Sequence, residues 1–432
     1  MNPSPIPNRR HFLKAASAAG VAGAVGFPSI TRGKDALDSR RLKIGLVGCG
    51  GRGTGAAGDA MTADSNVELW SMGDVFDISI EGSLKGLEKF KDRVNVGDRK
   101  FVGMDAYQKV LDSGIDVVIL ATPPGFRPIQ FKAAVEAGKH VFCEKPMAVD
   151  STGLRVVLES ARKAKEKGLT VCAGFCWRKS PSRIAALTRV LDGAIGDVLH
   201  YHATYYTSPV KPMQTAASRP AGMSDVEWQI RNWYNFSWLS GDGYVEQAIH
   251  SVDKVGWAFG DKDPLTCMAN GGRQVPFKGA EDYNIYDHFS CVYDFGSGRY
   301  ATISSRQIPG CDGENADYIT GTKGTCIIND NRVMITGENK WRFDKEKDAN
   351  MYTNEHILMS QALRAGAPVY DGDWMCHSVF LGLMGRMAAY TGKRITWDQI
   401  INSQEDLAPD DLKWDSKFTP TPMPKPGVTK VV

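Results

Sequence analysis

The chain has 432 residues, of which 42% are hydrophobic and 23% are charged. This length corresponds to about two to three domains, and the composition excludes a wholly disordered or collagen-like chain. The formal net charge of +3 is too small to indicate a nucleic-acid-binding protein, which would carry a strong basic excess.

The first segment has the pattern of an export signal. Arg9 and Arg10 precede a short, weakly apolar stretch at residues 15–27, as is typical of twin-arginine signal peptides. The stretch is shorter than the ~20 residues that span a bilayer, so we expect no stable membrane anchor. We assign residues 1–33 to a signal and linker, and expect periplasmic export by the twin-arginine machinery after folding in the cytoplasm. The alternative is a basic, alanine-rich disordered terminus.

The next segment carries a dinucleotide-binding motif. Residues 41–47 are predicted to form a strand, which leads directly into a GxGxxG loop with Gly48, Gly50 and Gly53. These glycines permit a tight turn, a close approach of backbone N–H groups to a pyrophosphate, and close packing of the following helix. The helix N-terminus then faces the phosphates with its partial positive charge.

The end of the second predicted strand, at residues 67–72, indicates which dinucleotide binds. Asp74 follows this strand, and no arginine stands at residues 74–77. A carboxylate at this place accepts hydrogen bonds from the adenosine ribose and repels a 2′-phosphate. We therefore expect NAD as the cofactor and weaker binding of NADP. The alternative is an ordinary strand–turn–helix with a surface aspartate.

Strands and helices continue to alternate up to Gly174. Strands and helices are predicted in turn at 116–122, 127–137, 140–143, 154–168 and 169–174. Such alternation indicates a doubly wound parallel sheet that binds its ligand at the carboxyl ends of the strands. We expect an α/β protein whose N-terminal Rossmann domain covers residues 41–175.

The pattern changes to paired strands after Arg178. Strands are predicted at 200–206, 286–295 and 299–305, with a hairpin turn at 296–298. Two late helices are predicted at 354–364 and 376–391. We assign residues 176–410 to a substrate and oligomerisation domain. Residues 411–432 are rich in proline and are expected to form an extended arm, lying on a neighbouring subunit.

Several of these segments resemble the Gfo/Idh/MocA family, which includes glucose–fructose oxidoreductase and inositol dehydrogenase. The resemblance is carried by the glycine loop, Thr122-Pro123, residues 137–141 (AGKHV), Glu144-Lys145-Pro146 and residues 241–253. It implies a Rossmann domain followed by an α/β domain with an open, mainly antiparallel sheet, which often mediates oligomerisation. It also implies pyridine-nucleotide redox chemistry on sugars and polyols. We accordingly expect a homodimer or homotetramer.

The resemblance also implies a catalytic set. Lys145 matches the family's EKP lysine, and Glu246 and His250 match a carboxylate and a histidine that act with it, although aspartate is usual at position 246. The spacing of Glu246 and His250 places them on one helix face, where the carboxylate would orient the imidazole that takes the hydroxyl proton. The predicted cofactor-binding residues are Gly48, Gly50, Gly51, Arg52, Gly53, Asp74, Thr122, Pro123, Glu144 and Lys145.

Aromatic and basic residues are candidates for the sugar site, because aromatic rings cover the apolar faces of a pyranose and basic side chains bind its hydroxyls. The candidates are Arg127, Trp177, Arg178, Tyr206, Trp233, Tyr234, Tyr283, His288 and Arg306. Core packing is the alternative for each of them.

No metal site is predicted from the cysteines or histidines. Cys172 with Cys176 and His200 with His202 have the spacing of ligand pairs but lack further ligands at a suitable distance. The nine cysteines are scattered, and we expect buried free thiols.

Three functions remain open. The first is an NAD-dependent oxidoreductase that transfers a hydride between a nicotinamide cofactor and a secondary alcohol of a sugar, polyol or saccharide derivative. The second is an NAD-dependent glycosidase or lyase that oxidises the sugar transiently and recycles a bound cofactor, which suits a compartment where free NAD is scarce. The third is a nucleotide- or sugar-binding protein without catalysis. The intact EKP segment favours the first.

Overall fold

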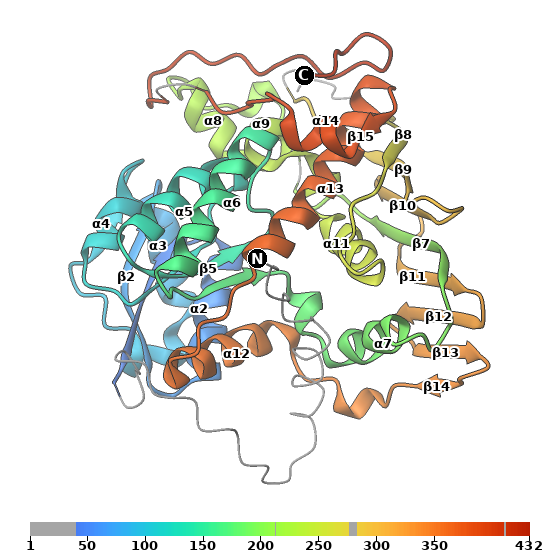
Figure 1. The fold of residues 1–432 in the computed structure, drawn as a ribbon. Coiled ribbons are helices and arrows are strands. Elements are labelled where there is room, and N and C mark those ends of the chain that lie inside the picture. The colour runs from blue at the N-terminus through green and yellow to red at the C-terminus, as the bar shows by residue number, and fades with distance from the viewer. Residues whose placement is uncertain (1–39, 212, 276–282, 410–411) are drawn as a thin grey trace, which may run out of the picture.

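The computed structural model describes residues 40–432 with the exception of 212, 276–282 and 410–411. The predicted signal peptide therefore lies outside the described residues. Two β-sheets lie side by side, each packed against helices, and the last segment of the chain crosses one end of the molecule (Figure 1). This arrangement confirms the predicted α/β class.

The first sheet is the predicted Rossmann sheet. Its six strands are all parallel and lie in the order β3-β2-β1-β4-β5-β6. They are β1 (Leu42–Val47), β2 (Val67–Asp74), β3 (Lys100–Val102), β4 (Val117–Leu120), β5 (His140–Glu144) and β6 (Val171–Gly174). Because the strand order reverses between β1 and β4, a crevice opens there at the carboxyl ends of the strands, where such folds bind ligands.

The helices of this half follow from local sequence signals. They are α2 (Gly51–Ala63), α3 (Asp77–Gly86), α4 (Ala106–Asp112), α5 (Arg127–Glu136) and α6 (Ser151–Glu166), with the 3-10 turns η1 (Glu88–Arg93) and η2 (Pro124–Phe126). Asp150 begins α6 by accepting a hydrogen bond from the backbone N–H of Gly153 at 2.7 Å. Gly168 adopts a φ of +67° beyond its end, as a glycine after a helix commonly does.

The second sheet is open and mixed, and mainly antiparallel, as predicted. Its order is β14-β13-β12-β11-β7-β10-β9-β8-β15, and β7 pairs in parallel with β10. The strands are β7 (Val198–Thr207), β8 (Thr266–Gly272), β9 (His288–Asp294), β10 (Tyr300–Gln307), β11 (Glu314–Gly321), β12 (Gly324–Asn329), β13 (Val333–Gly337), β14 (Trp341–Arg342) and β15 (Ile395–Thr396). The predicted hairpin at 296–298 joins β9 and β10, and all three of its residues have positive φ.

The second half contributes eight helices in the described part of the chain, of which α11 and α13 lie between the two sheets (Figure 1). They are α7 (Pro181–Leu191), α8 (Asp225–Arg231), α9 (Ser237–Ser240), α10 (Asp242–Glu246), α11 (Ile249–Ala258), α12 (Met351–Ala365), α13 (Gly372–Thr391) and α14 (Trp397–Asn402), and the 3-10 turns are η3 (Cys176–Lys179), η4 (Ala216–Ser218), η5 (Trp233–Asn235) and η6 (Lys345–Lys347). Nearly every residue of α13 is buried, because this helix contacts both β6 and β8. Among the described residues, no helix combines the length and apolarity needed to cross a membrane.

α12 belongs to the Rossmann half in space, although it comes late in the chain. It lies against α2 (Figure 1), and Met359 and Leu363 pack into the same core as Leu42 and Phe142. The ring of His356 stacks on Phe142, with centroids 4.3 Å apart. The predicted helix is confirmed, whereas its place beside the first sheet was not predicted.

The C-terminal arm is non-helical, as predicted, but it lies on its own chain. Figure 1 shows it crossing α8 and α9. The ring of Trp414 contacts Phe76 at 5.9 Å, and Phe418 contacts Trp238 at 5.4 Å. The arm's aromatic residues complete a core within the same chain, and the predicted contact with a neighbouring subunit stays a prediction. The oligomeric state stays a prediction.

The cysteines are free thiols, as predicted. Eight of the nine are buried, and Cys311 is exposed. Burial raises the pKa of Cys143 to about 12, so this thiol is uncharged and packs as a small apolar side chain.

The buried ring of His356 is expected to make stability depend on pH. Burial lowers the pKa of His356 to about 3, whereas an unfolded histidine titrates near 6.5. Between these values the unfolded chain binds a proton that the folded chain does not, so the free energy of unfolding falls as the pH falls. The loss between pH 7 and pH 4 amounts to about 3 kcal/mol.

Urea unfolding of wild type and His356→Phe across this pH range measures the contribution. We expect the difference in unfolding free energy between the two proteins to change with pH in favour of the variant at low pH. His288→Gln serves as the control, because the His288 side chain is 43% exposed. A pH-independent difference between wild type and His356→Phe would contradict the prediction.

Candidate active site

One cavity of about 530 Å³ lies at the carboxyl ends of the Rossmann strands. Gly48, Asp74 and Lys145 line it from the first half, and Glu246 and His250 line it from the second. Sequence segments more than one hundred residues apart therefore meet at the crevice that the strand order predicts.

The glycine loop leaves open space at the start of α2. Gly48 has a φ of +90°, and a Cβ on Gly53 would lie 1.9 Å from the carbonyl oxygen of Gly48, so both positions require glycine. A Cβ on Gly50 or Gly51 would meet nothing within 4 Å, and both residues line the cavity. The loop therefore exposes backbone at a helix N-terminus, which suits a pyrophosphate. Gly53 does not line the cavity and acts through packing.

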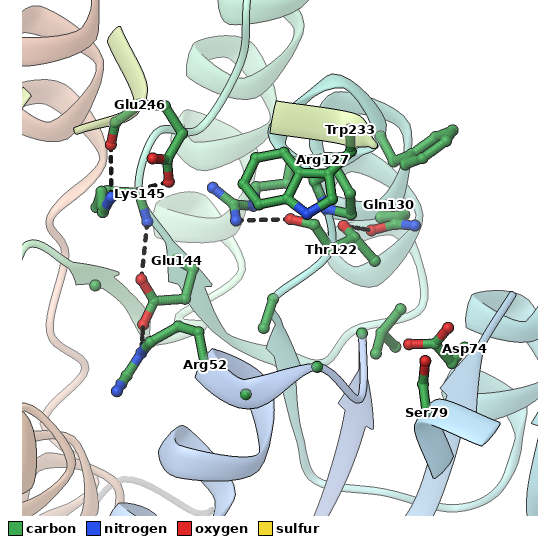
Figure 2. Close-up of a pocket in the computed structure, with 18 of the residues that line it drawn as sticks. Arg52, Asp74, Ser79, Thr122, Arg127, Gln130, Glu144, Lys145, Trp233 and Glu246 are labelled. Atoms are coloured by element: carbon green, nitrogen blue, oxygen red, sulfur yellow. Dashed lines mark hydrogen bonds and ion pairs between the residues drawn. The ribbon is translucent and has the colours of Figure 1, made fainter. Parts of the chain in front are cut away.

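Asp74 braces this loop from the end of β2. Its carboxylate accepts hydrogen bonds from the backbone N–H groups of Cys49 at 2.7 Å and Phe76 at 2.9 Å. Burial raises the pKa of Asp74, and these hydrogen bonds oppose the rise. Figure 2 shows its carboxylate close to Ser79, at one end of the cavity.

A chain of charged side chains occupies the other end of the cavity (Figure 2). The Nε of Arg52 donates to Glu144 at 2.5 Å, and the backbone N–H of Lys145 donates to the same carboxylate at 3.3 Å. The Nζ of Lys145 donates to Oε1 of Glu246 at 3.1 Å and to its carbonyl oxygen at 2.5 Å. These contacts connect the glycine loop to α10.

A neighbouring glycine makes room for this chain. A Cβ on Gly174, the last residue of β6, would lie 2.8 Å from Cδ of Glu144. Glycine at this position therefore allows Glu144 to lie against β6 and reach Arg52. The sequence pattern did not single out Gly174, because its role depends on a contact between two strands.

Glu246 and His250 do not share one helix, which corrects the prediction. Glu246 ends α10, and His250 lies in the first turn of α11, after an interruption at residues 247–248. The Glu246 carboxylate binds Lys145 and Gln247. In the described part of the chain, no hydrogen bond joins it to His250, so the predicted carboxylate–imidazole pair is wrong.

The imidazole of His250 lies among aromatic rings instead. It stacks on Trp177 with centroids 4.9 Å apart and meets Phe175 edge-on at 6.1 Å. Its Nδ1 is buried and has no hydrogen-bond partner among the described residues. Burial first, and then the positive charge of Lys145, lower the pKa of His250 well below its usual value. The ring is therefore neutral at physiological pH and able to accept a proton.

Three of the predicted substrate residues line the cavity, namely Arg127, Trp177 and Trp233. Arg127 is largely occupied by backbone, because its two terminal nitrogens donate to the carbonyl oxygens of Pro146 and Thr122. Arg127 therefore forms part of the cavity wall, and its contact with a substrate stays a prediction.

The remaining substrate candidates lie outside the cavity lining, engaged in packing or ion pairs. Arg178 pairs with Asp253 and Asp261, Tyr206 lies beneath Arg306, Tyr283 packs on Phe236, Tyr234 donates to Gln307, and His288 bonds Asp287. These residues do not line this cavity, and their contact with a substrate stays a prediction.

The sequence analysis missed several cavity residues, among them Tyr205, Gln247, Gln130 and Tyr352. Tyr205 donates to Gln247 at 2.9 Å, Gln130 accepts from Thr122 at 2.7 Å, and Tyr352 lies beneath Arg52. Strand alternation offered one usable signal, because Tyr205 shares a buried strand face with Tyr201, whereas Tyr206 points to the other face. Tyr352 comes from α12, whose position no sequence pattern showed.

The parallel sheet, the glycine loop and the carboxylate at the end of β2 define a Rossmann-type dinucleotide-binding enzyme fold. The chain belongs to the Gfo/Idh/MocA oxidoreductase family. Residues 42–174 match the model of its NAD-binding Rossmann fold, and residues 188–379 match that of its C-terminal alpha/beta domain. Residues 7–26 match the twin-arginine translocation pathway signal sequence, which confirms the predicted export signal.

Curated relatives are dehydrogenases. An inositol 2-dehydrogenase from Rhizobium meliloti is 24% identical over 337 residues, covering 76% of this chain and 90% of the relative. A scyllo-inositol 2-dehydrogenase (NAD(+)) from Bacillus subtilis is 25% identical over 291 residues, covering 67% of this chain and 74% of the relative. The family assignment makes the protein an oxidoreductase.

Solved structures share the fold. An aldose-aldose oxidoreductase from Caulobacter crescentus superposes with a TM-score of 0.65 at 18% identity, over 83% of this chain and all of its own. The WlbA dehydrogenase from Chromobacterium violaceum, solved with NADH and UDP-GlcNAcA, superposes with a TM-score of 0.64 at 18% identity, over 86% of this chain and 99% of its own. These superpositions establish the two-part architecture.

A methyl group at the glycine loop is expected to block cofactor binding without affecting the fold. Gly50→Ala places a Cβ in open space, with φ of −70° at that residue, so the apo protein should keep its thermal stability. We expect NADH to bind at least about tenfold more weakly, because the Cβ occupies the volume where the pyrophosphate approaches the backbone. Calorimetric titration with NADH measures this effect.

The matched control is Gly82→Ala in α3. A Cβ on Gly82 also meets nothing within 4 Å, but this residue does not line the cavity. NADH affinity should be unchanged in this variant, and alanine should favour the helix by up to about 1 kcal/mol. Equal NADH affinities for Gly50→Ala and wild type would exclude the loop as the pyrophosphate site.

Proposed function

We propose that this protein transfers a hydride between NAD and a secondary alcohol of a sugar, a polyol or a related saccharide in the periplasm. The observation that carries the proposal is one cavity lined by the glycine loop, Asp74, Lys145 and His250, in which Figure 2 shows Asp74 and Lys145 at opposite ends. The names of the relatives, inositol and levoglucosan dehydrogenases, support polyols and sugars as the substrate class, and the signal sequence supports the location.

The residues of the cavity fit a bound dinucleotide. Gly50 and Gly51 leave a cradle that Cβ atoms would fill. Among the lining residues, Arg52, Arg127 and His250 each have one buried polar atom without a partner in the described structure. Buried polar atoms are normally satisfied in native proteins, so these three positions suit contacts with ligands. Bound NAD would supply the hydride acceptor, which no side chain can provide.

Lys145 and His250 have separate roles toward the substrate hydroxyl. The Lys145 ammonium group is held by two oxygens of Glu246, and it can donate a further hydrogen bond to the hydroxyl oxygen. The neutral imidazole of His250 takes the hydroxyl proton as the hydride leaves carbon. Trp177, Trp233 and Tyr205 offer the aromatic surface of the same cavity to the ring of the substrate.

Substitution at this end of the cavity should reduce turnover and leave cofactor binding almost unchanged. General acid–base groups contribute about 10²–10⁴-fold to rate, so we expect losses of that order in kcat for Lys145→Ala and His250→Ala. Glu246→Ala should reduce kcat less, because Glu246 positions Lys145 and does not itself take the proton. His202→Ala is the control, since His202 stacks on Tyr318 in the second sheet and does not line the cavity.

The measurement is a panel of polyols and sugars with NAD, followed by NADH titration of each variant. The pH dependence of kcat/KM adds a second test. Because the pKa of His250 lies well below its usual value, the acid-side decline of kcat/KM should begin below pH 6.5, the ordinary histidine range. Full turnover of His250→Ala or Lys145→Ala on the best substrate would show that another group takes the proton.

Asp74 is expected to select NAD over NADP. Its carboxylate repels a 2′-phosphate and offers acceptors to the ribose hydroxyls, so wild type should bind NAD at least about tenfold more tightly than NADP. Asp74→Ala and Asp74→Asn should both narrow this ratio. Asp74→Asn keeps an oxygen that can accept from Cys49, so it separates loss of charge from collapse of the loop. A wild-type preference for NADP would refute the assignment.

An NAD-dependent glycosidase is the second candidate, favoured by the export signal. Outside the cytoplasm free NAD is scarce, so an enzyme that retains and regenerates its cofactor would suit the compartment. The substrate panel decides between the two candidates. Net reduction of added NAD indicates the dehydrogenase, whereas an aglycone released without net NADH indicates the glycosidase. Binding of NAD or sugar without either product would indicate a binding protein.

A further inference from the structure

A buried ion pair lies behind the proposed catalytic histidine. Lys254 stands one helical turn after His250 on α11, and its ammonium group binds the carboxylate of Asp317 on β11. Both side chains are only 1% exposed, and neither lines the cavity. Burying such a pair is costly, and replacement by apolar side chains is often neutral or stabilising. Its presence one turn from the active site therefore suggests a role besides stability.

The Trp177 ring connects this ion pair to His250. The Nζ of Lys254 lies 4.0 Å from the centroid of the indole, and the His250 ring stacks on the same indole at 4.9 Å. The guanidinium group of Arg183, on α7, also lies over the ring at 4.7 Å. A cation against an indole face is attracted by the negative charge of the π system, so Lys254 holds the ring on which His250 lies.

The charged groups near His250 are mostly cations. Lys145 at the end of β5, Lys254 on its own helix, Arg183 on α7 and Arg52 on α2 all act to lower its pKa, after the larger effect of burial. The nearby carboxylate, Glu246 on α10, is occupied by Lys145 and Gln247. Among the described residues, no carboxylate is hydrogen-bonded to the imidazole. The positive charges of these cations therefore make protonation of His250 less favourable.

We propose that Lys254, anchored by Asp317 and acting across Trp177, is a positioning residue that holds the His250 ring in place and keeps it in its neutral, proton-accepting form. The catalytic part of this inference rests on the proposed function, whereas the effect on the imidazole does not. Lys254 itself remains an ammonium at neutral pH, because burial lowers its pKa only to about 8 while Asp317 opposes the decrease.

The test removes the ion pair without leaving a buried charge unpaired. In Lys254→Met with Asp317→Asn, we expect the His250 titration to move upward by about one pH unit. The titration is followed by NMR of the holoenzyme labelled in its histidine rings, with the His250 signal assigned by its loss in His250→Gln. The acid-side decline of kcat/KM should move in the same direction. A purely structural role would lower stability without this shift.

Matched variants separate charge from packing. Lys254→Arg keeps the cation, and the His250 titration should stay at its wild-type position. Lys254→Gln keeps a donor for Asp317 and should show the upward shift even if the double variant does not fold. The remote ion pair of Arg364 and Asp64, 2.6 Å apart, is the control. Its removal by Arg364→Met with Asp64→Asn should leave the His250 titration unchanged.

The outcomes are distinct. An unchanged His250 titration in both Lys254→Gln and the double variant would overturn the proposal, whatever the turnover. If wild type turns over no sugar or polyol, the proposed function fails, and the NMR titration still decides whether Lys254 governs His250. A shift in the titration with no shift in the pH dependence of kcat/KM would overturn the link to catalysis.

Discussion

The ion pair between Lys145 and Glu246 is the contact on which the geometry of the cavity depends. Lys145 follows β5 of the first sheet, Glu246 ends α10 of the second half, and their side chains are about nine-tenths buried. Breaking a buried pair strands an uncompensated charge at a cost of about 3–5 kcal/mol. The two halves therefore have to dock in one register for both groups to be satisfied, and that docking forms the active-site end of the cavity.

A second carboxylate, that of Glu144, connects Lys145 to the glycine loop. Glu144 accepts from Arg52 and from the backbone of Lys145, so the loop and the proposed catalytic lysine share one carboxylate. A displacement of α2 would therefore move Lys145 through one intervening side chain, that of Glu144. α12 reinforces the arrangement, because Tyr352 lies beneath the guanidinium group of Arg52. A segment from late in the chain thus fixes the geometry of the first motif.

The sequence predicted those parts of the fold that are encoded locally. The end of α6 at Gly168 and the hairpin at 296–298 were visible because each depends on a few neighbouring residues. The position of α12 was not visible, because its apolar face matches the first sheet only in three dimensions. The ion pairs of Arg178 were not visible either, since its partners Asp253 and Asp261 lie far along the chain.

The active site likewise depends on contacts between distant segments, which local sequence patterns do not encode. Spacing alone placed Glu246 and His250 on one helix face, but the helix is interrupted between them, and Glu246 turns to Lys145. With no carboxylate bonded to it among the described residues, His250 owes its neutral state to burial and to surrounding cations. A base made neutral in this way is ready to accept a proton but becomes a buried cation once it has done so. Glu246 therefore acts on Lys145 rather than on the imidazole, because its carboxylate binds Lys145 and Gln247.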